Sequence, residues 1–129
     1  MKSNGHRYSE LDGLFVTVDN VIFMPNLDAP VDKPHPFVYF LSIQNESSET
    51  IVITGRKWIV DEDGTELIVV EGEGVVGQKP RLGPGEHFSY NSYHVTGGAA
   101  TARGMFFGNT IEGKKIRVPI PRFKLSPPC

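Results

Sequence analysis

Cysteine is nearly absent from this chain of 129 residues, and the only one is Cys129 at its end. No internal disulfide can form, and no internal thiol is present to act as a nucleophile. The first ten residues are polar and charged, without the apolar run of a secretion signal. We therefore expect a cytoplasmic protein without a disulfide framework.

Long apolar stretches and an excess of one charge are also missing. No segment approaches the roughly 20 apolar residues that a membrane-spanning helix needs. The 13 Lys and Arg side chains are matched by 15 Asp and Glu, which gives a net charge of −2. A nucleic-acid-binding protein usually carries a marked positive excess, at least on one face. We expect neither a membrane nor a nucleic acid as partner, although an average does not describe local clusters.

Windows that could hold a helix are scarce, because 14 Gly and 10 Pro are scattered along the chain. The apolar residues instead alternate with polar ones at the two-residue period of a half-buried strand. A parallel α/β fold is excluded, since its strands require crossover helices. The expected strands are residues 14–19, 37–44, 50–60, 65–70, 87–93, 101–107 and 115–125.

Two sequence features locate turns and sheet edges. Asp63-Gly64 is a strong hairpin signal between two of the expected strands. Pro119 and Pro121 cannot donate to a sheet ladder, so the strand 115–125 should be an edge strand or carry a bulge. Its apolar residues also change phase near these prolines, which a bulge would explain.

Seven or eight short strands at this spacing predict an all-β fold, a β-sandwich of the immunoglobulin type. The length suits a single domain over residues 1–129. We expect its core in residues 14–127 and a flexible N-terminal tail in residues 1–10.

A glycine-rich segment, residues 72–77, matches the pattern Gly-x-Gly-x-x-Gly. In dinucleotide-binding folds such glycines bring backbone amides close to a pyrophosphate at a helix N-terminus. Here Pro80 follows too soon for a helix, so that fold is excluded. Two interpretations stay open: the glycines provide positive φ and close backbone approach, or the turn holds an anion despite Glu71 and Glu73. The ligand-binding candidates under the second interpretation are Gly72, Gly74, Gly77, Lys79 and Arg81.

No catalytic or metal-binding set is recognisable. The four histidines do not pair at ligand spacing, and the carboxylates near Asp61 form a solvated hairpin tip rather than a calcium loop. His87 and Ser89 lie close together in sequence, but a mixed polar and aromatic outer strand face accounts for them. We expect no enzyme activity, no cofactor and no metal ion.

The aromatic residues give the best physical hint of function. Trp58 should lie in the core, as the strand tryptophan of immunoglobulin-type domains does. Seven further aromatics exceed what one small core holds, so part of them should form an exposed apolar patch, which usually marks a partner site. They are Tyr39, Phe40, Phe88, Tyr90, Tyr93, Phe106 and Phe107.

The combination of motifs resembles the ApaG family. The resemblance is carried by the run 71–80, by the Pro84-Gly85-Glu86 segment with Phe88 and Tyr90, and by Val118-Pro119-Ile120-Pro121 with Phe123 and Leu125. Asn45, the Arg56-Lys57-Trp58 strand and Gly104 support it. It covers residues 14–127, but the family's usual Gly-Cys-Pro loop is replaced at residues 93–100.

This resemblance implies a fibronectin type III-like sandwich and a poorly defined biochemical role. Bacterial members are linked to cobalt and magnesium resistance, and eukaryotic members look like interaction modules within larger proteins. The leading hypothesis is a non-enzymatic module that binds an unknown protein partner, with a homodimer as one possibility. The alternative is a pyrophosphate- or nucleotide-binding protein that uses the glycine-rich turn.

Overall fold

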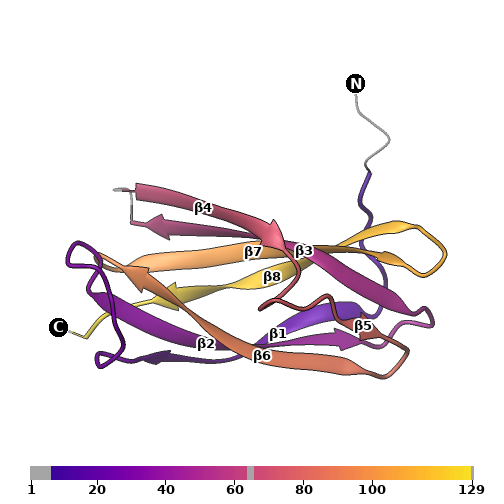
Figure 1. Ribbon diagram of the computed structural model, residues 1–129, viewed down its shortest axis with the longest axis horizontal. Coiled ribbons are helices and arrows are strands. Elements are labelled where there is room, and N and C mark those ends of the chain that lie inside the picture. The colour runs from indigo at the N-terminus through magenta and orange to yellow at the C-terminus, as the bar shows by residue number, and fades with distance from the viewer. Residues whose placement is uncertain (1–6, 64–65, 129) are drawn as a thin grey trace.

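The computed structural model describes residues 7–63 and 66–128, and these residues form eight β-strands and no helix (Figure 1). No helix that could span a membrane occurs in this part of the chain. The strands are β1 (Leu14–Phe23), β2 (His35–Asn45), β3 (Ile51–Glu62), β4 (Glu66–Glu73), β5 (Arg81–Leu82), β6 (His87–Thr96), β7 (Ala100–Thr110) and β8 (Lys115–Leu125).

The strands form two antiparallel sheets that lie one over the other in Figure 1. One sheet has the order β1-β2-β6, and the other has the order β4-β3-β7-β8 with the short β5 also paired to β3. The predicted all-β sandwich of seven to eight strands is confirmed. The predicted hairpin between β3 and β4 is confirmed by the pairing of Glu62 with Glu66, although Gly64 itself lies outside the described residues.

The core lies between the two sheets and is built from the inward-facing residues of both. Phe37, Tyr39, Leu41 and Ile43 alternate along β2, as the sequence predicts, and all are buried. Trp58 on β3 faces them and is only 2% exposed, so its predicted core position is confirmed.

The last strand carries the predicted bulge. On β7, two steps separate Ala102 from Gly104, whereas their partners on β8, Phe123 and Ile120, are three residues apart. The extra residue falls at Pro121 and Arg122, where the phase of the apolar residues changes. β8 is also an edge strand of its sheet, so both consequences of the proline pattern hold.

The expected N-terminal tail is described from residue 7 onward. Ser9 forms a parallel bridge to β8, in which its amide donates to the carbonyl of Lys115 at 3.2 Å and its carbonyl accepts from Arg117 at 3.1 Å. The ring of Tyr8 packs edge-on against Phe107, with centroids 5.0 Å apart. These contacts fix the segment before β1 along the outer face of the larger sheet.

Candidate functional site

The glycine-rich segment connects β4 to β5 and so passes from one edge of the larger sheet back to β3. Within it, Val75 and Gln78 form a tight reversal: each amide donates to the other's carbonyl, at 2.7 and 2.9 Å. Val76 and Gly77 at the tip both have positive φ, 42° and 79°. We call residues 72–78 the glycine turn.

At Gly74 and Gly72, other atoms of the protein lie so close to the backbone that a Cβ would collide with them. Gly74 has φ of +65°, and a Cβ there would collide with the backbone carbonyl of Gln78. A Cβ on Gly72 would lie within 2.9 Å of three atoms of the Arg56 guanidinium. Positive φ with close backbone approach therefore describes Gly74, whereas Gly72 has only the end of the Arg56 side chain close to it.

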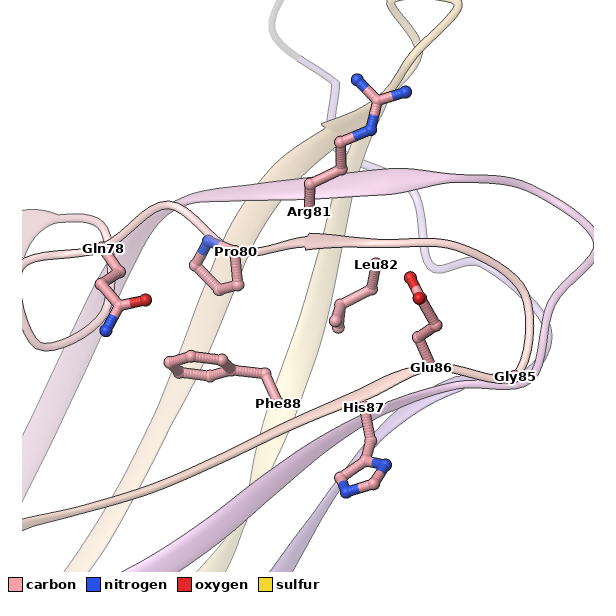
Figure 2. Close-up of a pocket in the computed structure, with 8 residues that line it drawn as sticks. All are labelled: Gln78, Pro80, Arg81, Leu82, Gly85, Glu86, His87 and Phe88. Carbon is pink, nitrogen blue, oxygen red and sulfur yellow. The ribbon is translucent and has the colours of Figure 1, made fainter.

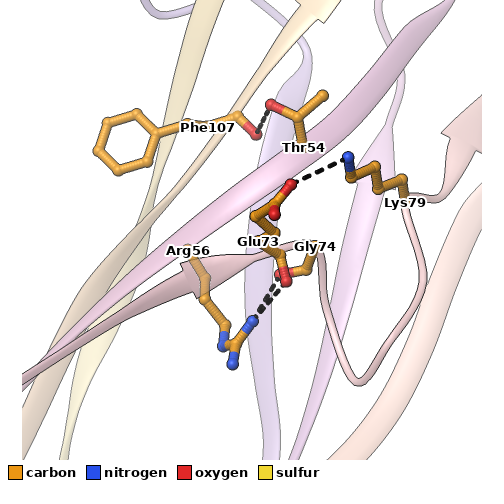
Figure 3. Close-up of polar contacts among 6 residues, drawn as sticks. All are labelled: Thr54, Arg56, Glu73, Gly74, Lys79 and Phe107. Atoms are coloured by element: carbon orange, nitrogen blue, oxygen red, sulfur yellow. Dashed lines mark hydrogen bonds and ion pairs between the residues drawn. The ribbon is translucent and has the colours of Figure 1, made fainter.

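Arg56 is the residue that organises the glycine turn, and no sequence motif indicates this contact. It lies on the inner face of β3, where it pairs in register with Phe106 on one side and Gly72 on the other. Its Nη1 donates to the carbonyl oxygens of Glu73 at 2.7 Å and Gly74 at 3.2 Å (Figure 3). The turn thus directs carbonyl oxygens toward a cation, which is the reverse polarity of an amide cradle for an anion.

The two cations expected to assist an anion site point in different directions. The Lys79 ammonium lies 3.3 Å from the Glu73 carboxylate, and both groups are exposed (Figure 3). The Arg81 guanidinium extends away from Leu82 and Phe88 in Figure 2. Two of the five predicted ligand residues thus have their donors engaged within the protein, since Lys79 pairs with Glu73 and the amide of Gly74 donates to the carbonyl of Thr54 at 2.8 Å.

A hollow of about 620 Å³ lies beside this segment, between β5 and the start of β6 (Figure 2). Pro80, Leu82 and Phe88 line it with apolar surface, and Gln78 and His87 add polar groups. Its one carboxylate, Glu86, already accepts a 2.6 Å hydrogen bond from the amide of Gly83. The hollow is therefore a mixed surface with no paired acid and base.

Asn45 holds the rim of this hollow together from inside the protein. It is fully buried, and its amide nitrogen donates to the carbonyls of Glu49 and Leu82 at 2.8 and 2.9 Å. Its Oδ1 accepts from both the amide and the hydroxyl of Ser47. Its backbone carbonyl also accepts from Gly85. Every polar atom of this side chain is satisfied, so its role is to join β2, β5 and the turn before β6.

The even-numbered residues of β6 point into the sandwich, whereas His87 and Ser89 lie exposed on the expected outer face. His94 stacks on Tyr39 with ring centroids 4.8 Å apart and meets Trp58 edge-on at 4.9 Å. Burial lowers the pKa of His94 from 6.5 to about 4. Burial likewise raises the pKa of Tyr90, whose hydroxyl, like His94 Nε2, has no hydrogen-bond partner among the described residues.

Ser89 lies on the opposite, outer face of β6 and has no histidine partner. Its hydroxyl is 2.8 Å from that of Ser42, which donates to the carboxylate of Asp19. Asp19 also accepts from Thr17 at 2.8 Å. This short relay ends in a carboxylate and includes no histidine, so it is not the arrangement that activates a serine as a nucleophile. Within residues 7–63 and 66–128, no group of three or more His, Cys, Asp or Glu could hold a metal ion.

The exposed apolar side chains of the strands gather on β4 rather than on the aromatic residues expected from the sequence, although Tyr93 is as exposed as Val69. Tyr39 and Phe106 are buried, and of the seven aromatics only Tyr93 is classed as exposed. On β4, by contrast, Leu67 is 59%, Val69 49% and Val70 43% exposed.

The exposed residues of β4 occupy both faces of the strand. Leu67 and Val69 lie on the outer face, whereas Val70 pairs in register with the inward-facing Trp58. The smaller sheet therefore leaves part of the inner face of β4 uncovered. The unbroken run Leu67-Ile68-Val69-Val70 does not indicate this exposure, because such a run is typical of a strand buried on both faces.

The two edges of the larger sheet differ in how they are protected. β8 carries Pro119, Pro121, a bulge and a row of charged residues, all of which discourage pairing with a further strand. β4 pairs only with β3 and has neither proline nor charge between Leu67 and Val70. We call this unprotected side of β4, residues 67–70, the β4 edge.

Comparison with known proteins shows similarity to a single family. The ApaG domain model matches residues 25–109. The chain is 32% identical over 108 residues to the protein ApaG of Enterobacter sp. (strain 638), covering 83% of this chain and 86% of that one. It is 37% identical over 91 residues to the protein ApaG of Deinococcus radiodurans, covering 69% and 70%.

A solved structure resembles the chain over nearly its whole length. The crystal structure of a Bordetella pertussis protein named ApaA superposes with a TM-score of 0.81 at 32% identity. The match covers 95% of this chain and 98% of the other.

Proposed function

The chain belongs to the ApaG domain family, and from that premise we propose that it is a non-enzymatic protein-binding module whose partner adds a strand to the β4 edge. The observation that carries the proposal is the contrast between the two edges of the larger sheet. β8 has three separate protections against strand pairing, and β4 has none over residues 67–70.

Strand addition suits the β4 edge for two physical reasons. An edge strand presents a row of unpaired backbone amides and carbonyls, which an extended partner segment can satisfy by main-chain hydrogen bonds. The exposed side chains of Leu67, Val69 and Val70 then supply apolar area for alternate side chains of the partner. Both terms favour another polypeptide over a small ligand, and a second copy of this chain is one such polypeptide.

The competing proposal places pyrophosphate or a nucleotide at Gly72, Gly74 and Gly77. It has less support, because the carbonyls of Glu73 and Gly74 face Arg56 and Lys79 pairs with Glu73. Titration of the labelled protein with pyrophosphate tests it through the amide shifts of residues 72–78. A cytoplasmic location and a link to cobalt and magnesium resistance remain predictions.

Site-specific photo-crosslinking tests the binding function in cells. A benzoylphenylalanine replaces Val69 on the β4 edge or, as the matched control, Val31, which is 99% exposed on the loop before β2. We expect a protein adduct, either a partner or a second copy of the chain, from position 69 and none of that mass from position 31. A second substitution, Leu67→Lys, should remove the adduct by placing a charge within the interface.

The folded state of each variant is checked by its circular dichroism and melting curve. Exposed substitutions of this kind usually change stability by no more than about 0.5 kcal/mol. If the variants are folded and position 69 yields no adduct beyond those of position 31, the proposal is wrong.

A further inference from the structure

A second recessed surface lies on the outer face of the larger sheet, away from the glycine turn. It is a hollow of about 470 Å³ between β3, β7 and β8. Ile59, Met105, Phe107 and Pro119 supply its apolar lining. We call it the basic hollow, because its remaining large side chains are Lys57, Arg103, Arg117 and Arg122.

Strand register explains why the cations surround an apolar centre. Met105 in the middle of β7 pairs with Lys57 on one side and Pro119 on the other, so all three lie on one face. Two residues before Met105 on β7, Arg103 lies opposite Ile59 of β3. The bulge at Pro121 places Arg122 beside Arg103 as well. Charged and apolar side chains from three strands are therefore interleaved over one small area.

Few ion pairs among the described residues hold the cations of the basic hollow, although Glu71 on β4 lies opposite Lys57 in the strand register. Within residues 7–63 and 66–128, neither Lys57 nor Arg103 nor Arg122 forms an ion pair, and Arg117 has only the exposed Glu10 at 3.9 Å. Crowded like charges are mutually repulsive, and a bound anion would relieve that repulsion.

The outer face of the sheet as a whole carries more cations than carboxylates, although Asp61 and Glu71 also lie on it. Although the chain has a net charge of −2, this face holds nearly half of its 13 Lys and Arg side chains. They are Lys57, Arg103, Lys115, Arg117, Arg122 and Lys124.

Edge protection explains only part of this arrangement. Charged residues on β8 keep an exposed edge from pairing with another strand. Lys57 and Arg103, however, lie on β3 and β7, which are interior strands with a neighbour on each side. Both are half-buried beside apolar surface, where a charge is more costly than in open water. Their position calls for a ligand rather than for edge protection.

We propose that the basic hollow binds a phosphate ester with a flat apolar group. Guanidinium groups match the geometry of phosphate oxygens and bind them in a bidentate manner, which favours Arg103, Arg117 and Arg122 as the anion ligands. The apolar lining around Met105 and Phe107 contacts the organic part. The volume lies in the range of small-ligand sites, which favours a small ester over a nucleic acid or an acidic protein.

Phenyl phosphate is the probe, with inorganic phosphate and phenol as its two halves. Amide shifts of the full chain are followed during titration at low salt. We expect saturable shifts in residues 57–59, 103–107 and 117–122, with phenyl phosphate binding at least about tenfold more tightly than inorganic phosphate, since burying the ring adds apolar contact. Added salt should weaken the binding, as screening requires.

Co-sedimentation with phosphatidylcholine vesicles, with and without phosphatidic acid, distinguishes a lipid source of the ester from a soluble one. Binding only to vesicles with phosphatidic acid, lost in Arg103→Gln, identifies a lipid headgroup. Phenyl phosphate binding without vesicle binding identifies a soluble ester.

Arg103→Gln removes one guanidinium from the hollow and should weaken phenyl phosphate binding at least about tenfold. Arg81→Gln, which removes an exposed guanidinium from β5, is the matched control and should bind as the unmodified chain does. Unchanged amide positions elsewhere show that each variant is folded. Three results would overturn the proposal: no saturable shift, equal affinity for inorganic and phenyl phosphate, or shifts confined to residues 72–81.

Discussion

His94 should make this protein less stable in mildly acidic solution. The ring lies inside the sandwich, between Tyr39 and Trp58, and burial lowers its pKa from 6.5 to about 4. In the unfolded chain the pKa of His94 returns to its ordinary value of 6.5. Because the folded-state pKa is the lower one, the stabilisation is fully present above pH 6.5 and is lost as the pH falls toward 4.

The magnitude follows from the two pKa values of His94. One unit of difference corresponds to about 1.4 kcal/mol between the protonation states. Linkage over this interval gives a loss of about 2 kcal/mol in the free energy of unfolding between pH 7 and pH 5. Carboxylates titrate mainly below pH 5, so the upper part of the acid range isolates the histidine.

Urea unfolding at pH 7, 6 and 5 measures this effect. His94→Phe keeps an aromatic ring against Tyr39 and Trp58 but cannot take a proton, so its stability should change far less over the interval. His87→Phe alters an exposed ring on the same strand and should retain the full dependence. Equal pH dependence in the unmodified chain and in His94→Phe would refute the reasoning.

Three further substitutions test the region around the glycine turn by urea unfolding. Asn45→Ala should cost roughly 3 kcal/mol, since several buried groups lose their partners, whereas the exposed Asn91→Ala should change stability by less than about 0.5 kcal/mol. Gly74→Ala should lower the free energy of unfolding more than Gly77→Ala does, because a Cβ at position 74 collides with Gln78. A Cβ at position 77 meets nothing within 4 Å, so only the strain of the left-handed conformation applies there, about 1–2 kcal/mol. Val76→Gly should stabilise the protein by about 1 kcal/mol, since a β-branched residue is strained at φ of 42°.

The alternation of apolar residues was sufficient to predict the strands, because the pleat repeats every two residues and one face is buried. It failed where the backbone leaves that period. In β1 a bulge between Val18 and Asn20 reverses which residues of the strand face inward. The alternation therefore ends at the bulge, whereas the strand continues to Phe23, beyond its predicted end. On β8 the same kind of irregularity was predictable, because two prolines reveal it in the sequence.

The candidate sites were less predictable, because side-chain direction depends on pairing between distant strands. The position of the glycine turn was predictable from its sequence. The carbonyl groups of the turn, however, face Arg56, which lies 16 residues before Gly72 in the chain. Likewise, Lys57, Arg103 and Arg122 come from three strands and become neighbours only through the sheet register. A net charge of −2 conceals that cluster, because charge averaged over the chain carries no positions.

Hydrogen exchange of the β4 backbone amides tests the central claim most directly. Strand addition requires new main-chain hydrogen bonds along residues 67–70, which a contact through side chains alone would not form. We predict that the amides that point away from β3, every second one in an antiparallel edge strand, exchange rapidly in the free chain and become strongly protected in the complex captured by crosslinking from position 69. Unchanged exchange along β4, with protection gained at another surface, would contradict the account.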